Sequence, residues 1–428
     1  MQNRKIYKEL ECSNIMVTKY DIFELVYRYK HPIKPIEILK RLNKDEREYD
    51  NILRILAELA NEKLLVKTVY GFQASRADKA KILYDIIYYC LSNDLNYNEI
   101  LDKNIAEFIN QALQIGEINS KNIKLNPRTV KKYVEILSKN GLILIIAEKP
   151  LRAKIFCNIL LNNIFVYFGY KKEVIAEDHY NYLTSIEKEL AKFRKLRKGK
   201  EVKYKQILED FEISFIHHSL ALEGNPITLP QTRRILRDKI IPSNLRSEDV
   251  DEVKNYQKAL TQMLLDSQNK KPLTMQTILN YHALAMQHNL EIAGRIRKIP
   301  VYIKGNLGFR ITKTEKIEDE LSKLLEDYNK FIKKKSILEE ILNFAVYFHN
   351  EFQHIHPFED GNSRTTRLIT FHLLQFKDIP IVDIPFGLLD EYLSYTKGSK
   401  KRNDIKLCQN LQKIILFNLK KINDKLSS

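Results

Sequence analysis

The stretch His354-Ile-His-Pro-Phe-Glu-Asp-Gly-Asn-Ser-Arg-Thr-Thr-Arg367 decides how the second half of the chain is expected to fold. Apolar residues recur at helical spacing before it, from Leu338 to Phe352, and a second apolar run follows from Leu368 to Leu374. A residue that precedes proline is disfavoured in the α region, so the first helix is expected to end near Ile355. We therefore predict that this stretch is the corner between two packed helices.

The turn in this corner is suited to hold an anion. Gly361 and Asn362 tolerate positive φ, and Ser363 is a candidate N-cap for the second helix. The backbone N–H groups of residues 361–364 would then point into the loop, where a helix N-terminus favours phosphate. Arg364 and Arg367 share one helix face, and a bound polyanion would offset the unfavourable meeting of these cations with the helix dipole.

Two further side chains in the corner carry chemistry of their own. Asp360 offers a hard oxygen ligand that suits Mg²⁺ bridging phosphates, and His356 can accept a proton near neutral pH. A zinc site is the local alternative, because His349, His354 and His356 lie close together. No cysteine is nearby, however, and the spacing matches no usual zinc pattern. We predict a phosphate-handling site, with His349 packed against the motif.

The segment from His356 to Arg367 resembles the signature of the Fic family, whose members transfer AMP from ATP to hydroxyl side chains. The family pattern is His, any residue, Phe, any residue, Asp or Glu, Gly, Asn, Gly, Arg, two residues, Arg. This chain departs from the pattern at Ser363, where the family usually has Gly. The resemblance spans roughly residues 200–400 and implies a mainly α fold, a Fic-type helical bundle with a small β-hairpin flap.

The resemblance also implies a role for each residue of the motif. His356 would be the general base that takes the proton from the target hydroxyl. Asp360 would hold Mg²⁺ on the ATP phosphates, and Phe358 would anchor the loop in the core. The other expected nucleotide-binding residues would line the anion hole, grip the β- and γ-phosphates or lie near the adenine: Gly361, Asn362, Ser363, Arg364, Arg367 and Tyr392.

A second motif lies upstream, at Ser219-Leu-Ala-Leu-Glu-Gly-Asn225. Ser219 and Glu223 are four residues apart and share a helix face, and the Gly-Asn-Pro that follows ends the helix. Taken alone, this is an ordinary helix stop. Beside the first motif it resembles the inhibitory motif of the Fic family, which implies that Glu223 pairs with Arg367 and keeps it from the γ-phosphate.

A third segment, Gly294 to Gly305, is predicted to form a short β-hairpin arm with alternating apolar residues. It resembles the flap with which the family holds a target segment by strand addition. The alternative is an ordinary surface hairpin. The residues expected to contact the target are Ile299, Val301, Tyr302 and Ile303.

The N-terminal third predicts one or two winged-helix-like domains. Helices at 20–30, 36–42 and 47–61 precede a strand at 64–69. A similar order recurs, with Asn126 and Pro127 as the cap and first residue of its last helix, in helices at 79–91, 97–113 and 126–140 and a strand at 142–146. Such domains bind DNA or dock proteins. DNA is favoured by the basic residues of the last helix, Arg128, Lys131, Lys132 and Lys139.

Composition sets wider limits. The 428 residues carry a formal charge of +17 and are 44% hydrophobic, which allows several domains with real cores. Four isolated cysteines indicate a reducing cytoplasm, and the apolar run 155–170 is too short for a membrane span. The expected parts are two winged-helix-like domains (1–75 and 76–156), connecting helices and a linker (157–205), an inhibitory-motif region (206–270), a Fic catalytic core (271–405) and a C-terminal helix (406–428).

Three functions remain open from the sequence. The first is an ATP- and Mg²⁺-dependent protein adenylyltransferase that modifies a target protein and itself and is autoinhibited by Glu223. The second is another enzyme of the same fold, which removes AMP or transfers a different nucleotide or phosphate group. The third is a DNA-binding regulator whose Fic-like half is a sensor. The corresponding partners are a hydroxyl side chain of a target protein, DNA, and a second copy of the chain in a homodimer.

Overall fold

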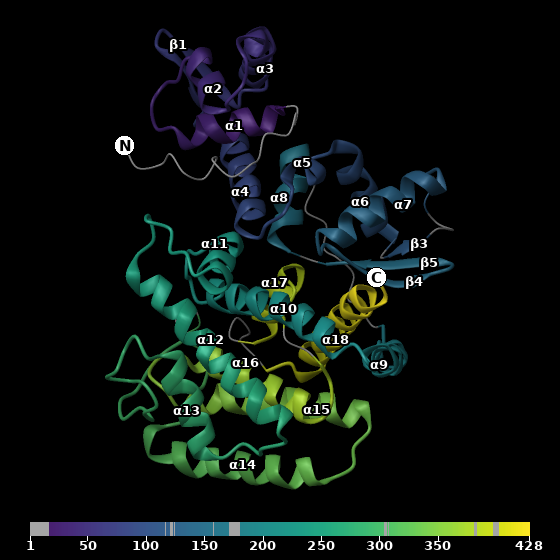
Figure 1. Ribbon diagram of the computed structural model, residues 1–428, viewed down its shortest axis with the longest axis vertical. Helices are drawn as coiled ribbons and strands as arrows, with labels where there is room; N and C mark the ends of the chain where they lie inside the picture. The colour runs from purple at the N-terminus through teal and green to yellow at the C-terminus, as the bar shows by residue number, and fades with distance from the viewer. Residues whose placement is uncertain are drawn as a thin grey trace. The chain divides into compact units, whose positions relative to one another are not determined.

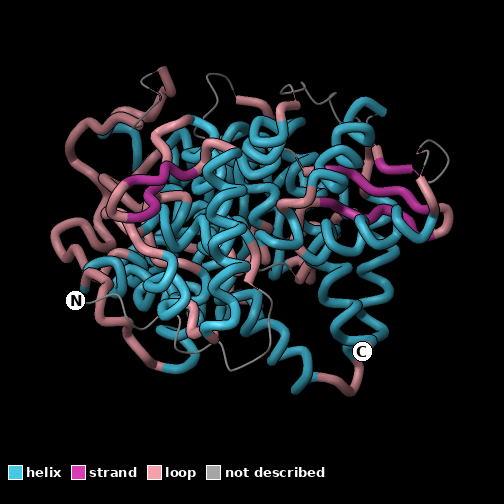
Figure 2. Tube along the Cα trace, turned by 90° about the horizontal axis from the view of Figure 1, so that it is seen from above, coloured by secondary structure: helices cyan, strands magenta, loops and turns pink. Residues whose placement is uncertain are grey.

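The fold of the chain was analysed in a computed structural model and is mainly helical, as predicted (Figure 1). Strands are few and short (Figure 2). The structure describes residues 17–115, 117–119, 123, 125–156, 158–170, 180–303, 306, 308–380, 383–396 and 402–428.

The chain forms two compact units. Unit 1 comprises residues 1–140 and 159–175, and unit 2 comprises residues 141–158 and 176–428. The expected second winged-helix-like domain, 76–156, is thus divided between the two units at Asn140. All the predicted site residues belong to unit 2.

Unit 1 begins with three helices and a hairpin, in the order that the sequence predicts. The hairpin pairs Leu65 with Ala74 and Thr68 with Gly71, and an isolated bridge joins Ile33 to Phe72. These elements are α1 (Lys19–Arg28), α2 (Pro35–Arg41), η2 (Glu46–Glu48), α3 (Tyr49–Asn61), β1 (Leu65–Thr68) and β2 (Gly71–Ala74). Their order fits a winged helix, and that assignment stays a prediction.

The rest of unit 1 is helical except for one short strand. Asn126 caps its last-but-one helix by accepting from the N–H of Arg128, and Pro127 is the first helical residue, as predicted. The helix expected at 97–113 is broken, because Asp102 caps a new helix by accepting from Asn104 at 2.7 Å. The elements are α4 (Asp78–Ser92), α5 (Tyr97–Ile100), α6 (Lys103–Ile115), β3 (Ile118–Asn119), α7 (Pro127–Lys139) and α8 (Ile159–Phe168).

Unit 2 opens with an antiparallel hairpin that pairs Ile143 with Ile155 and has an irregularity between Ile145 and Ala147. Helices make up the remainder. In order, the elements are β4 (Ile143–Glu148), β5 (Leu151–Ile155), α9 (Leu183–Arg197), α10 (Glu201–Ala221), α11 (Leu229–Arg233), the π-helix η3 (Arg234–Asp238), α12 (Ser247–Gln268), α13 (Met275–Ala285), η4 (Thr314–Lys316), α14 (Ile317–Lys333), α15 (Leu338–Ile355), α16 (Asn362–Phe376), η5 (Phe386–Leu388), α17 (Leu389–Tyr395) and α18 (Asp404–Ser427).

Helix α16 lies at the centre of unit 2. Every residue from Arg364 to Leu374 is buried, and α12, α13 and α15 all contact this helix (Figure 1). Phe215 of α10 packs on Phe371, with ring centroids 5.0 Å apart. A helix buried on all sides is held rigidly by its neighbours, so the residues at its N-terminus are fixed in place.

Two further expectations concern membranes and cysteines. Within the described ranges, every helix is too short or too polar to span a bilayer. Cys90 and Cys408 are free thiols, whereas Cys12 and Cys157 lie outside the described residues. The apolar run at 155–170 holds α8, which buries Leu160 and Phe165.

Candidate active site

The predicted helix–loop–helix corner is present. Helix α15 ends at Ile355 as expected, but His356 adopts a left-handed conformation with φ 49° rather than an extended one. The N-cap of α16 is Gly361, with φ 78°, and not Ser363, which is the second helical residue. A left-handed conformation at the N-cap favours glycine. The helix therefore has its N-cap at Gly361, two residues before the predicted N-cap, Ser363.

Two side chains give the loop its shape. Asn362 closes it, since its amide nitrogen donates to the Phe358 carbonyl at 2.7 Å and its oxygen accepts from the Phe358 N–H at 2.9 Å. Phe358 is fully buried, as predicted, and stacks on the ring of His282 with centroids 3.7 Å apart. The Asn362 side chain therefore fixes the shape of the loop, and the backbone N–H groups are the candidates for binding a phosphate.

The first turn of α16 offers that backbone. The N–H of Thr365 makes the first intrahelical bond, to the Gly361 carbonyl at 2.9 Å. The amides of Asn362, Ser363 and Arg364 come before it, at the positive end of a helix. Such amides are a general anion-binding arrangement.

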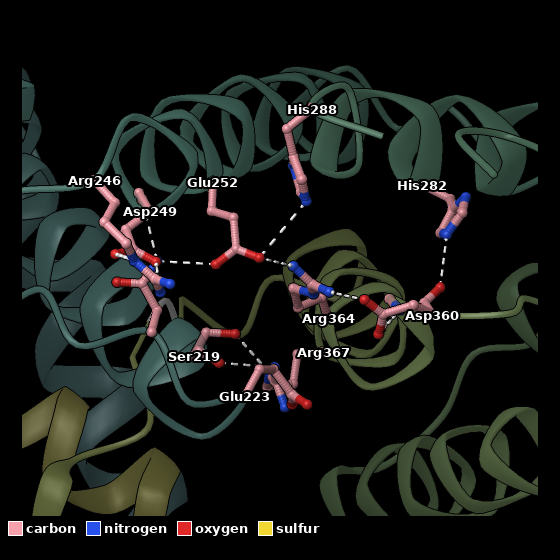
Figure 3. Close-up of polar contacts among 12 residues, drawn as sticks. Ser219, Glu223, Arg246, Asp249, Glu252, His282, His288, Asp360, Arg364 and Arg367 are labelled. Carbon is pink, nitrogen blue, oxygen red and sulfur yellow. Dashed lines mark hydrogen bonds and ion pairs between the residues drawn. The ribbon is translucent and has the colours of Figure 1, made fainter. Parts of the chain in front are cut away.

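Arg364 links the loop to helix α12 (Figure 3). Its guanidinium, 3% exposed, donates to Asp360 at 2.8 Å and to Glu252 at 3.2 Å. Glu252 also accepts from the amide of Asn225 at 2.9 Å, and Asn225 lies just after the predicted inhibitory glutamate. Arg364 is thus shared by two carboxylates, one of which touches the second motif.

Arg367 is fully buried and makes the predicted ion pair with Glu223, at 3.0 Å (Figure 3). Its Nε also donates to the hydroxyl of Ser219 at 2.5 Å, and an Nη donates to the Ser219 carbonyl at 3.0 Å. Burial acts to lower the pKa of Arg367, but the charge and hydrogen bond of Glu223 together with the nearby phenols of Tyr256 and Tyr392 outweigh it, and the pKa is raised. The two motifs of the sequence therefore meet at one guanidinium.

Tyr392 lies inside the protein, and its place near an adenine stays a prediction. Its ring is 6% exposed, and its hydroxyl donates to Nε2 of His349 at 2.8 Å. His349 in turn contacts Asn350 at 3.1 Å, and the Asn350 amide donates to Asp404 at 2.6 Å. Burial raises the pKa of Tyr392 to about 12 and lowers that of His349 to about 4, so both groups are neutral near pH 7.

The three clustered histidines point to different partners. His349 takes part in the chain just described, His354 contacts the Arg310 carbonyl at 2.9 Å, and His356 contacts the Gln353 carbonyl at 3.2 Å through Nδ1. A carbonyl can only accept, so Nδ1 of His356 carries the hydrogen and the lone pair of a neutral ring is on Nε2. That nitrogen is suited to take a proton.

Asp360 fits a magnesium ion that is held mainly by substrate. Its carboxylate is 65% exposed and accepts from Arg364 and from the N–H of Gly361 at 2.6 Å. The described part of the chain contains no cluster of three or more His, Cys, Asp or Glu side chains that could hold a metal ion. Mg²⁺ typically uses one or two carboxylates with phosphate oxygens and water, which this single exposed carboxylate beside a helix N-terminus can supply.

The predicted arm differs from a β-hairpin in its described residues, 294–303; Lys304 and Gly305 lie outside them. These residues form no strand, because their backbone groups bond elsewhere: the Ile299 carbonyl accepts from the Arg297 side chain, and the Ile303 carbonyl accepts from Asn306. Of the expected target contacts, Tyr302 and Ile299 are 78% and 54% exposed, Val301 is half-buried and Ile303 is buried.

Three residues of the site were missed by sequence reasoning: Glu252, His282 and Arg297. Nε2 of His282 donates to the Asp360 carbonyl at 2.9 Å, while Nδ1 accepts from the N–H of Gly294 at 2.9 Å (Figure 3). Burial lowers the pKa of His282 to about 4, which keeps this ring neutral. His282 and Arg297 bind backbone groups, and Glu252 binds side chains far from it in the sequence, so none of these contacts leaves a local pattern in a sequence.

Comparisons with known proteins agree with this geometry. Residues 272–374 match the sequence model of the Fic/DOC family. Relatives named protein adenylyltransferase Fic include one from Drosophila persimilis, 30% identical over 42% of this chain and 35% of that protein, and one from Drosophila grimshawi, 25% identical over 64% and 55%. The chain thus spans about a third to about half the length of these curated relatives.

A solved structure shows the same fold. It is a Fic domain containing signaling protein from Bacteroides thetaiotaomicron, with a TM-score of 0.50 and 21% identity, and the match covers 56% of this chain and 97% of that one. The family match includes the corner and its buried arginines, and it includes or adjoins the helices around them. Residues 272–374, which include the corner and its two arginines, therefore match the Fic/DOC family.

Proposed function

We propose that the chain is a protein adenylyltransferase, which moves AMP from Mg²⁺-bound ATP to a hydroxyl side chain of a target protein and of itself. The observation that carries this proposal is the meeting of His356 with the N-terminal amides and two buried arginines of α16 within one corner. A base, an anion site and two cations are the parts that nucleotidyl transfer to an alcohol requires. The names of the related proteins support the same reaction.

In the proposed reaction, the target oxygen forms a bond to the α-phosphorus while the bond from that phosphorus to the bridging oxygen breaks. Pyrophosphate leaves, and the hydroxyl proton passes to Nε2 of His356. The amides of Ser363 and its neighbours stabilise the charge that grows on the α-phosphate, and Arg364 and Arg367 hold the leaving phosphates. Mg²⁺, held in part by Asp360, neutralises phosphate charge when it is bound.

We also propose that Glu223 restrains the reaction. Its carboxylate occupies Arg367 at 3.0 Å, at the cation that a phosphate would otherwise bind. Arg367 is fully buried and cannot turn toward solvent, so phosphate and carboxylate compete for the same group. Loss of Glu223 is expected to favour productive ATP binding.

Labelled ATP tests both statements. We expect Glu223→Gly to raise incorporation of label from [α-³²P]ATP into the chain at least about tenfold, because the competitor of the phosphate is gone. Adding His356→Ala should abolish the incorporation. Glu359→Gln, which removes an exposed carboxylate of the loop that the proposed reaction does not use, is the matched control and should leave the incorporation unchanged.

The same experiment separates the other reactions of this fold. Incorporation from [γ-³²P]ATP instead of the α-label would mean phosphate transfer, and would contradict nucleotidyl transfer. Release of AMP from previously labelled chain, lost in Glu223→Gln, would mean that the glutamate serves removal of AMP. No gain of label in Glu223→Gly would contradict the restraint.

A further inference from the structure

Arg297 is a buried cation that binds carbonyl groups. Its residue is 3% exposed, and in the described ranges no carboxylate forms an ion pair with it. Its Nε donates to the His356 carbonyl at 2.7 Å, one Nη to the Ile299 carbonyl at 3.2 Å and the other to the Thr312 carbonyl at 2.5 Å. All three nitrogens of the guanidinium are therefore used.

The three carbonyls belong to three different places. The first is the backbone carbonyl of His356, the proposed base; the second lies within the arm, at Ile299, and the third lies beyond the arm, at Thr312. The backbone N–H of Arg297 adds a bond to the Pro357 carbonyl at 2.9 Å. One side chain thus joins both ends of the segment 299–312 to the residue that would accept the proton.

Only arginine has the shape for these contacts. Its donors form a rigid planar fork, whereas a lysine ammonium is a single point that cannot reach three separated carbonyls with the same geometry. Burying a charge is costly unless hydrogen bonds replace its water, and here the oriented carbonyl dipoles do so. A buried guanidinium of this kind is expected where the geometry of its hydrogen bonds matters more than its contribution to stability.

Two further contacts tie the same parts together. The N–H of Thr312 donates to the His354 carbonyl at 2.9 Å, and His282 connects Gly294, the first residue of the arm, to the Asp360 carbonyl. Among these links, that of Arg297 alone reaches Ile299, Thr312 and His356. The described residues of the arm are therefore tied to the corner, although they form no strand.

We propose that Arg297 is a positioning residue, which sets the place of the target segment on the arm relative to His356. This inference rests on the proposed function. A target hydroxyl must arrive within about 3–3.5 Å of the reacting atom, so a small displacement of the arm slows transfer strongly. Arg297 touches neither the phosphate-binding amides nor Arg367, and its loss spares nucleotide binding.

The test uses the full chain with Glu223→Gly as the parent. Arg297→Lys should lower self-labelling at saturating Mg²⁺-ATP at least about tenfold, while the dissociation constant for Mg²⁺-ATP, measured by calorimetry, stays within about threefold. Arg295→Lys, an exposed neighbour on the same segment, is the matched control and should change neither quantity. A general loss of structure would weaken ATP binding as well, which would overturn the proposal.

Hydrogen exchange gives a second measurement that needs no activity. The amide of Thr312 and those of Ile299, Val301, Tyr302 and Ile303 should exchange at least about tenfold faster in Arg297→Lys than in Arg295→Lys. Equal exchange in the two variants would overturn the proposal. A parent that takes up no α-label would contradict the proposed function alone, because the exchange result still decides the role of Arg297 in holding the arm. Arg297→Gln replaces the lysine variant if the latter fails to fold.

Discussion

At the scale of single residues, Gly361 shows how closely the corner is built. Its φ is +78°, and a Cβ placed there would lie 2.9 Å from the sulfur of Met286 and 3.0 Å from Nε2 of His282. Gly224, in the second motif, has φ +96° but nothing within 4 Å of such a Cβ. The two glycines share an unusual backbone conformation and differ in the space around them.

This contrast leads to a prediction for alanine at each position. Gly224→Ala should reduce the free energy of unfolding by about 1 kcal/mol, from backbone strain alone. Gly361→Ala should cost about 2–4 kcal/mol, since Met286 and His282 must also shift. Urea titrations of both variants measure the difference. Similar losses would show that the loop can absorb the methyl group.

Some residues of the site could be predicted from the sequence and others could not. Ser219 lies in the last turn of α10 and Glu223 just beyond its end, and the resemblance of this segment to the Fic inhibitory motif, rather than its spacing, implied the contact with Arg367 that the structure shows. Ser363 was wrong as an N-cap, because a left-handed Gly361 begins the helix without a side-chain cap. Asn362 turned inward to bond Phe358, which a turn propensity cannot foresee.

At the scale of elements, helix ends were predicted well where local chemistry sets them. Helix α15 ends before the His-Pro pair, and α7 begins at Pro127. The arm was predicted less well. Its alternating apolar residues match a strand, but a strand needs a partner, and the Arg297 side chain takes the carbonyl of Ile299 instead.

Helix α13 contributes one group whose protonation affects folding. The pKa of His282 is lowered by burial to about 4, below its ordinary value of 6.5. Between these two pH values the unfolded chain binds the additional proton, so the contribution to stability is complete above about pH 6.5 and is lost as the pH falls toward about 4. The shift corresponds to about 3 kcal/mol.

His282→Gln tests this linkage. Glutamine can still donate to the Asp360 carbonyl and accept from Gly294, but it does not titrate. Between about pH 7 and about pH 4.5, the free energy of unfolding should therefore fall by about 2–3 kcal/mol less in this variant than in the wild type. The exposed His31→Gln is the control and should follow the wild type. Parallel curves for all three proteins would contradict the linkage.

At the scale of the whole molecule, the chain divides into a unit with the site and a unit whose role is still a prediction. The order of elements in unit 1 agrees with the order predicted from the sequence. Helix α7 presents Arg128, Lys131 and Lys132 on its exposed side. Lys131 has a carboxylate of Glu135 3.7 Å away, and Lys139 pairs with Glu99 at 3.2 Å. Arg128 and Lys132 are thus the residues to change when DNA binding is tested.

We expect the full chain to retard duplex DNA in a gel at about 50 mM salt and to release it as salt rises, because phosphate contacts displace counterions. Charge reversal at Arg128 and Lys132 should weaken the binding at least about tenfold. Reversal at Lys333 and Lys335, two exposed lysines of unit 2, changes the net charge equally and should have little effect. Equal retardation by both double variants would show that the binding depends only on net charge and not on Arg128 and Lys132.

The chain of contacts from Asp404 to Tyr392 has a fixed polarity. The Asp404 carboxylate only accepts, so the amide nitrogen of Asn350 must face it and the Asn350 oxygen faces Nδ1 of His349. Nδ1 therefore carries the hydrogen, and Nε2 of His349 accepts from Tyr392. The phenol hydrogen is then committed to the imidazole, and its lone pairs are left for the guanidinium of Arg367, whose charge and hydrogen bonding act to lower the pKa of the phenol. In Glu223→Gly, the neutral phenol is expected to keep that guanidinium in place after its carboxylate partner is lost.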